Sequence, residues 1–438
     1  MLGRHPRGLI VLFFTEMWER FGFYTLMAIY VLYMDKALGW SDASKSDFYK
    51  WFTFVVYIVP ILGGLIGDGR LGHRNTVRLG AVMMTVGYVS LALSSREWLA
   101  PFYVGLALVA TGTGLFKGNM SVLVGNLYPA ASQLKDSAFN IFYMGINLGG
   151  LLGPIVATWI SSRFGSYNLS FAAAAIGMLL SIAIFQWGRG HLAPVQAGGL
   201  SLANAGGDPV TQSSPAEDRQ RIATLVALFV ISMFFWLGYF QNWLTFTLFA
   251  ERSTATTLHL LPPIGGWDGS FTLRPEAYQI FNPAFILLLT PLLVAGFTRA
   301  RTMGREPSST WKICAGLIVA GVSLLIMVAA GLGGGDGDRN VMSPLWLISL
   351  YLLLTTGELL ISPMGLSLVS KVAPQRMRGL MMGLWFGGTA AGGWLAGQLG
   401  RYYGDMPHHR YFLLIAALLF FGALLAFLVR RRLDRFGG

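Results

Sequence analysis

Long apolar runs dominate the sequence and constrain the fold more than any other feature. A helix that crosses a bilayer needs about 20 mostly apolar residues. Only 12% of the 438 residues are charged, against about 25% in a soluble domain. The sequence therefore predicts an all-α integral membrane protein with twelve transmembrane helices. They are expected at roughly 8–34, 47–69, 76–94, 100–127, 137–162, 169–187, 222–250, 277–297, 312–333, 343–369, 379–400 and 410–430.

The connections between these runs predict the orientation of the chain. Cytoplasmic connections of membrane proteins carry an excess of Lys and Arg. A cytoplasmic N-terminus puts about twice as many of these residues inside as outside. Both termini are therefore expected to be cytoplasmic, in a multi-pass protein of the inner cell membrane. The net charge of +12 lies mostly in these short connections, so nucleic acid is not an expected partner.

The longest inside connection, 188–221, is rich in Gly, Ala, Ser and Pro and is predicted to be a flexible linker. It divides the chain into two six-helix bundles, 1–187 and 222–438. Two such halves are the layout of major facilitator transporters. The stretch "GGLIGDGRLGHR" at 63–74 resembles the G-x-x-x-D-R-x-G-R-R loop of that superfamily.

The first apolar run carries three charged residues, Glu16, Glu19 and Arg20, on one helical face. Each costs at least ~2.5–3.5 kcal/mol at the centre of a membrane helix. Glu16 and Arg20 are four residues apart and can pair directly, which leaves one acid over. Two interpretations remain open: an ion pair that only orients one helix, or part of a polar path.

Further polar residues lie at membrane depth in both halves. Lys117 is a lone cation in the fourth span and needs an acid, which the first span can supply. Glu358 is a lone acid in the tenth span, with Ser362 one turn further on, and Asn147 lies in the fifth. Both halves thus contribute buried polar groups, as a central site between them requires.

Several separated motifs resemble those of the proton-dependent oligopeptide transporters (the POT or PTR family). "EMWERF" at 16–21 matches the E-x-x-E-R-F motif, and "FYMGINLG" at 142–149 matches the fifth-helix motif. "GTGLFKGNMSVLVGNLY" at 112–128 looks like the F-K-P-N-x-S-x-L-V-G signature, with Gly118 in place of the proline. The stretch at 357–386 is similar to the family's tenth and eleventh helices.

This resemblance implies roles for the matching positions. Glu16, Glu19 and Arg20 would form a proton-linked cluster that faces Lys117, and Lys117 would also attract a peptide carboxylate. Glu358 would bind the peptide amine, helped by Asn147 and Asn282. The residues implied to line the pocket are Tyr24, Tyr57, Trp236, Ser362 and Trp385.

Two departures from the family pattern concern an implied outer gate. The arginine expected in the first helix is Met27, and the glutamate expected in the seventh is Phe240. Replacing only one of the two charges would leave the other buried without a partner in a gate that excludes water, whereas replacing both avoids this cost. A methionine also packs well against an aromatic ring. We expect a gate that closes by hydrophobic packing. The chain also leaves no room at 188–221 for the two extra helices of many bacterial relatives.

The resemblance implies a proton-coupled symporter that imports di- or tripeptides by alternating access. The alternatives are a carrier of another zwitterionic or anionic solute, an exporter on the same fold, or a substrate-sensing receptor. No metal-ligand spacing and no GxSxG occurs, so an enzyme, a metal site and a cofactor other than the coupling proton are not expected. The expected partners are small peptides and the bilayer, with the monomer as the functional unit.

Overall fold

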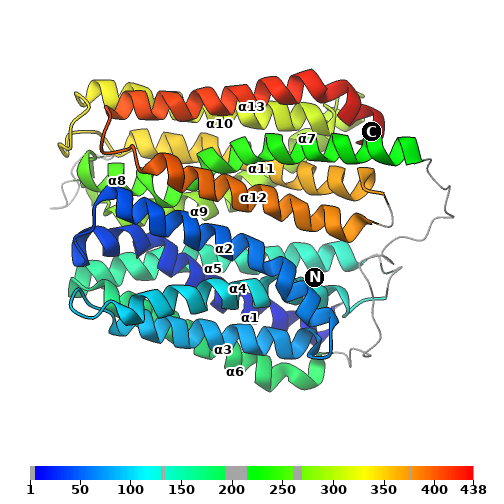
Figure 1. Ribbon diagram of the computed structural model, residues 1–438, viewed down its shortest axis with the longest axis horizontal. Coiled ribbons are helices and arrows are strands. Elements are labelled where there is room, and N and C mark those ends of the chain that lie inside the picture. The colour runs from blue at the N-terminus through cyan, green and yellow to red at the C-terminus, as the bar shows by residue number, and fades with distance from the viewer. Residues whose placement is uncertain are drawn as a thin grey trace. The chain divides into compact units, whose positions relative to one another are not determined.

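The structure is a computed structural model that describes residues 5–129, 132, 134–192, 215–259, 269–374 and 377–437. Long helices make up most of it (Figure 1). Within these residues, nine helical segments are long and apolar enough to cross a membrane, so the chain is a multi-pass membrane protein. These segments are Asp42–Asp68, Gly72–Leu93, Ser137–Phe164, Tyr167–His191, Glu217–Arg252, Pro275–Thr302, Ser309–Gly333, Leu345–Val369 and His408–Arg435.

Three further helices coincide with predicted spans but are not among the nine: α1 (Arg7–Leu32), α4 (Ala100–Gly125) and α12 (Arg378–Gly400). Each has at least 23 residues, and at 1.5 Å per residue that length is enough for a ~30 Å hydrocarbon core. For two of them the sequence offers a reason, because α1 carries two acids and an arginine and α12 is rich in glycine. The count of twelve spans stays a prediction.

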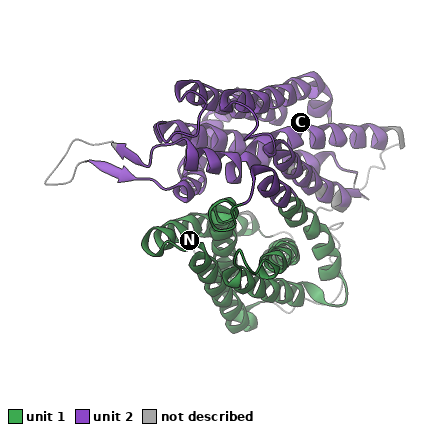
Figure 2. Cartoon of the chain, turned by 60° about the vertical axis from the view of Figure 1, so that its left-hand side comes forward, with its two compact units in different colours: residues 1–39, 51–206 green, residues 40–50, 207–438 purple. Residues whose placement is uncertain are grey.

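The chain forms two compact units, and the first comprises residues 1–39 and 51–206 (Figure 2). In this unit α1 packs against α5 and α6, and α3 packs against α4 and α6. A short π-helical turn, Tyr33–Ala37, extends α1. Besides α1 and α4, the helices of this unit are α2 (Asp42–Asp68, from residue 51 on), α3 (Gly72–Leu93), α5 (Leu134–Phe164) and α6 (Tyr167–Trp187).

Glycines allow α3 and α4 to approach closely. A Cβ on Gly80 would lie 2.6 Å from the carbonyl oxygen of Gly112, and one on Gly112 would lie 2.7 Å from that of Gly80. Small residues let membrane helices pack backbone to backbone, which replaces the hydrophobic driving force that lipid does not provide. The glycine content of the chain thus has a direct packing role here.

The second unit comprises residues 40–50 and 207–438. In this unit α7 packs against α12 and α13, and α10 packs against α11 and α13. Besides α12, the helices of this unit are α7 (Pro215–Tyr239), α8 (Thr245–Arg252), α9 (Phe281–Thr302), α10 (Ser309–Gly333), α11 (Leu345–Val372) and α13 (His408–Gly437).

The predicted linker is only partly described. The turn Gly188–His191 follows α6, and α7 begins at Pro215, so 215–221 are helical where a flexible linker was expected. Residues 193–214, and with them the absence of two extra helices, lie outside the described residues. The unit boundaries also differ from the predicted domain bounds, since 40–50 group with the second unit.

The seventh span is interrupted, whereas the sequence predicts one continuous helix over 222–250. After α7 the chain forms a 3-10 turn, Phe240–Trp243, before α8 begins. Broken helices survive at membrane depth only where the freed backbone groups find partners. Here the Asn242 carbonyl accepts hydrogen bonds from Gln279 Nε2 at 2.9 Å and from Thr247 Oγ1 at 3.1 Å. The Phe240 carbonyl accepts one from the Tyr49 hydroxyl at 2.7 Å.

A small antiparallel hairpin departs from the all-α prediction. Strands β1 (Thr257–His259) and β2 (Ser270–Thr272) pair in the connection between α8 and α9, and Figure 2 shows them extending from the helices of their unit. His259 is the last residue of β1 and pairs with Ser270. Threonines at 257 and 272 suit strands because they are β-branched.

Candidate functional site

The charged residues of α1 form a buried cluster. Glu16, Glu19 and Arg20 each have at most 4% of their surface exposed. Arg20 binds Glu19 through two hydrogen bonds, from Nε to Oε2 and from Nη2 to Oε1 at 2.5 Å. The predicted pair of Arg20 with Glu16 is longer, with 3.5 Å between Nε and Oε1. Glu19, not Glu16, is therefore the main partner of the arginine.

Glu16 is consequently the acid that can still accept a hydrogen bond or a proton. Its Oε2 atom is buried and has no hydrogen-bond partner. A buried acceptor without a partner costs roughly 1–3 kcal/mol, so such an atom points to a role other than stability. The positive charge of Lys117 on α4 interacts electrostatically with the carboxylates of Glu16 and Glu19.

Lys117 itself forms no ion pair within 4 Å among the residues that the structure describes. Its ammonium group lies 5.0 Å from the ring centroid of Tyr57 on α2, a cation–π distance. Three of the predicted residues on different helices are thus near one another: Glu16, Tyr57 and Lys117. The ammonium keeps hydrogen-bonding capacity for a further anion, since a lysine has three donors.

A second polar cluster lies in the other unit, around the carboxylate of Glu358 on α11. Asn282, at the start of α9, donates from Nδ2 to Glu358 Oε2 at 2.8 Å and to Thr355 Oγ1 at 3.0 Å. The Tyr239 hydroxyl donates to Asn282 Oδ1 at 3.3 Å and so helps to orient the amide that binds Glu358. Glu358 forms no ion pair in the described part of the chain, so its negative charge is held by neutral donors alone.

Tyr239 and Thr355 were missed by the sequence reasoning. Both had an accessible signal, because Thr355 lies one turn before Glu358 and Tyr239 lies one turn after Trp236. Residues three apart share a helix face. A search of the faces that carry Glu358 and Trp236 would have found them.

Two of the implied pocket residues in the second unit carry polar atoms without a partner. Trp236 Nε1 and Ser362 Oγ are both buried and make no hydrogen bond. Trp236 packs its ring against Tyr239 and Phe240, with centroids 5.2 and 5.8 Å apart. Trp385 packs against Phe229 instead and is 3% exposed. Trp236 and Ser362 thus offer free hydrogen-bonding groups, whereas Trp385 is mainly a packing residue.

The remaining predicted residues have ordinary surroundings. Asn147 Nδ2 donates to the Tyr143 carbonyl one turn earlier at 2.9 Å, and the Tyr24 ring lies against Gly150. Met27 and Phe240 are both fully buried. They belong to different units, so their pairing in a gate stays a prediction.

The chain matches the family model described as the POT family over residues 74–204 and 208–409. It is 31% identical to a di-/tripeptide transporter of Lactococcus lactis subsp. cremoris, with 87% of this chain and 86% of that protein covered. It is also 31% identical to dipeptide and tripeptide permease A of Klebsiella pneumoniae, covering 90% and 84%.

Solved structures show the same likeness. The chain resembles a peptide transporter POT crystallised with sulfate, with a TM-score of 0.87, 28% identity, and coverage of 99% of this chain and 96% of the other. It also resembles a POT family transporter in complex with 5-aminolevulinic acid, with a TM-score of 0.86, 26% identity and coverage of 98% and 97%. The family match covers most of the sequence, and the stretches around Lys117 and Glu358 lie within it. This chain belongs to the POT family of transporters.

Proposed function

We propose that the chain is a proton-coupled symporter that imports di- and tripeptides by alternating access. The relatives named as di-/tripeptide transporters support peptides as the substrate. The proposal includes twelve spans with both termini cytoplasmic, a place in the inner cell membrane, and transport by the monomer. It needs no cofactor other than the coupling proton and involves no enzymatic step.

The buried cluster of charged residues on α1, Glu16, Glu19 and Arg20, is the observation that supports proton coupling. Two acids share one arginine, and the Glu16 oxygen without a partner is the atom that a proton can occupy. Protonation there removes one negative charge from the surroundings of Lys117. Coupling follows if proton and substrate together favour a state that neither favours alone. Glu16, Glu19, Arg20 and Lys117 are the proposed coupling residues.

The substrate is proposed to bind by its two charged ends. Lys117 provides a cation for the peptide carboxylate, and Glu358 provides an anion for the peptide amine. The hydrogen bond from Asn282, whose amide Tyr239 orients, fixes the Glu358 carboxylate without neutralising it, which preserves its charge for an incoming cation. Trp236 Nε1 and Ser362 Oγ offer further polar contacts, and Tyr24, Tyr57, Asn147 and Trp385 are proposed to line the pocket.

Uptake by the purified protein in liposomes tests this function directly. With an imposed pH gradient, acid outside, a labelled dipeptide should accumulate above its external concentration. Lys117→Ala should abolish this accumulation, while counterflow, which needs no net proton movement, should survive at a peptide concentration high enough to offset the lost carboxylate contact. Full gradient-driven accumulation by Lys117→Ala would contradict the assigned role of the lysine.

A second candidate function is transport of a non-peptide zwitterion. It is favoured by the similar POT family transporter solved with 5-aminolevulinic acid, since that ligand also carries an amine and a carboxylate. Competition in the same uptake assay separates the two. If 5-aminolevulinic acid inhibits and is itself accumulated while dipeptides are not, the non-peptide function holds.

A further inference from the structure

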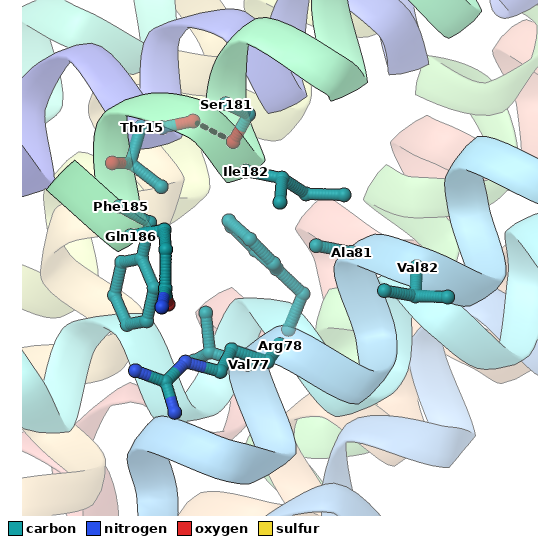
Figure 3. A pocket seen from close by; sticks show the side chains of 10 residues that line it. Thr15, Val77, Arg78, Ala81, Val82, Ser181, Ile182, Phe185 and Gln186 are labelled. Atoms are coloured by element: carbon teal, nitrogen blue, oxygen red, sulfur yellow. Dashed lines mark hydrogen bonds between the residues drawn. The ribbon is translucent and has the colours of Figure 1, made fainter.

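Unit 1 contains a cavity that the transport proposal does not use. It has a volume of about 160 Å³ and lies beside α1, α3, α4 and α6 (Figure 3). Its hydroxyl groups are already satisfied: Ser181 donates to the Thr15 carbonyl at 2.7 Å, and Thr15 donates to the Val11 carbonyl at 2.7 Å. The rest of its wall is mainly apolar, formed by Val77, Ala81, Val82, Phe116, Ile182 and Phe185.

The cavity is at the apolar surface of the unit. Val82, on its rim, is 50% exposed, and its neighbours Leu79 and Val86 on α3 are 45% and 50% exposed. In a membrane protein, a surface of this kind faces lipid hydrocarbon. An engineered apolar cavity of roughly 150 Å³ stays dry and holds a benzene-sized molecule. This cavity therefore suits a short stretch of hydrocarbon chain and not a water cluster.

Arg78 adds a positive charge at the edge of the cavity. Its guanidinium lies 6.0 Å from the Phe185 ring centroid, and its Nη1 donates to Asn75 at 3.1 Å. Its Nε is buried without a hydrogen-bond partner. Among the described residues Arg78 makes no ion pair with a carboxylate.

A second arginine lies one turn away on the same helix. The charge of Arg74 interacts with that of Arg78, and like charges four residues apart destabilise a helix. Arg74 uses one nitrogen to bind the Leu192 carbonyl at 2.5 Å. Arg78, with its partnerless Nε and a second positive charge one turn away, favours an anion, and the planar guanidinium matches a phosphate well.

We propose that this cavity binds an anionic phospholipid of the bilayer, with its phosphate on Arg78 and part of an acyl chain inside the cavity. The apolar wall and the exposed Val82 favour a lipid over a soluble phosphate, which has no hydrocarbon to bury. The paired arginines favour a net negative headgroup over a zwitterionic one. The Lys and Arg distribution predicts that this end of α3 is on the cytoplasmic side, where anionic lipids attract basic groups.

Bound lipid would bridge α3 and α6, which pack together beside the cavity. A ligand that binds only the folded state raises the unfolding temperature by mass action. The test is thermal unfolding of the purified full chain in detergent, titrated with dioleoyl phosphatidylglycerol, with native mass spectrometry to count bound lipids. Dioleoyl phosphatidylcholine and glycerol 3-phosphate are the comparison probes.

The wild type should be stabilised by phosphatidylglycerol, much less by phosphatidylcholine, and not by glycerol 3-phosphate. Arg78→Gln should weaken the apparent affinity for phosphatidylglycerol about tenfold, the effect of losing one charge-assisted hydrogen bond. Arg163→Gln is the matched control, because Arg163 also lies beside a phenylalanine, 5.9 Å from the Phe164 ring, but not at this cavity. Equal stabilisation by the two lipids, or by glycerol 3-phosphate, would overturn the proposal.

A second pair of variants tests the hydrocarbon part without touching the charge. Val82→Phe should fill the mouth of the cavity and reduce phosphatidylglycerol binding. Val86→Phe, one turn further on, equally exposed and outside the cavity, should leave it unchanged. If both variants bind like the wild type, no acyl chain enters this cavity and the inference is wrong. The result is independent of which solute the protein transports.

Discussion

The amide of Asn282 donates a hydrogen bond of 2.8 Å to the carboxylate of Glu358. Asn282 is the second residue of α9 and Glu358 lies in α11, so this bond joins two helices that pack against each other. The same amide nitrogen also donates to Thr355. A negative charge held only by neutral donors is fixed in position but still available to a cation, which is what recognition of a peptide amine requires.

Replacing Glu358 should therefore act on the substrate amine. Glu358→Gln keeps the shape of the side chain but removes its charge, so peptides with a free amine should lose affinity roughly tenfold or more, as expected for a hydrogen bond to a charged group. N-acetylated peptides, which have no cationic amine, should lose much less. Uptake competition with matched free and acetylated dipeptides measures the difference. An equal loss for both would assign Glu358 another role.

Asn282 should act through the position of that carboxylate. Asn282→Ala removes the hydrogen bond to Glu358 and should raise the KM for free-amine peptides more than it lowers the maximal rate. Thr355→Val is the matched control, since it removes the other acceptor of the same amide and leaves the Glu358 bond intact. Similar KM values for the two variants would show that the amide bond to Glu358 has no part in substrate binding.

The sequence predicted the class of fold from its apolar runs, and it singled out candidate site residues because charges at membrane depth stand out against those runs. It did not predict the partners of these residues. Spacing favoured Arg20 with Glu16, but Arg20 makes its shorter bonds with the adjacent Glu19. Sequence spacing shows which residues share a helix face but not which rotamer the packing selects.

The interruption of the seventh span shows a second limit of sequence reasoning. The stretch "FQNW" at 240–243 contains no glycine or proline, so its apolar surroundings indicate a continuous helix. The turn is stabilised by Gln279 and by Tyr49, which are distant in sequence. A break that depends on tertiary hydrogen bonds leaves no local signal. The hairpin strands are too short to give a pattern of their own.

The unequal pairing of Arg20 predicts different outcomes for the two acids of α1. Glu19→Gln removes the charge that Arg20 binds through two hydrogen bonds, and breaking a buried ion pair costs about 3–5 kcal/mol. Glu16→Gln removes a longer contact and a partnerless oxygen, so it should cost far less stability while abolishing gradient-driven uptake. Thermal unfolding in detergent, together with proteoliposome uptake, tests both. The assignment fails if Glu16→Gln lowers the unfolding temperature as much as Glu19→Gln.

Gly149 on α5 should be irreplaceable beside this cluster. A Cβ at Gly149 would lie 2.2 Å from the Met17 carbonyl oxygen and 2.9 Å from Arg20 Cβ, so Gly149→Ala forces α5 away from α1. The neighbouring Gly150 is the matched control, because its Cβ would make only ordinary contacts of 3.4–3.5 Å with the Tyr24 ring. Gly149→Ala should lower the unfolding temperature by several degrees, as overpacking costs about 1–3 kcal/mol. Equal stability of the two alanine variants would contradict the close approach.

The connection between α9 and α10 should make stability depend on pH. Glu306 accepts hydrogen bonds from Arg301 Nε at 2.6 Å and from Lys312 Nζ at 2.6 Å. The bonds from Arg301 and then from Lys312 lower the pKa of Glu306 from 4.5 to about 2. Because the folded pKa lies below the unfolded one, the stabilisation is fully present above about pH 4.5 and is lost as the pH falls toward 2.

Glu306→Gln removes this titration and provides the measurement. At pH 7 the variant should unfold at a lower temperature than the wild type, because its neutral amide cannot replace two charge-assisted bonds. The difference between the two unfolding temperatures should shrink by more than half between pH 5 and pH 3, since the wild type loses a contribution that the variant never had. A difference that stays constant from pH 7 to pH 3 would show that the Glu306 carboxylate does not contribute to stability through Arg301 and Lys312.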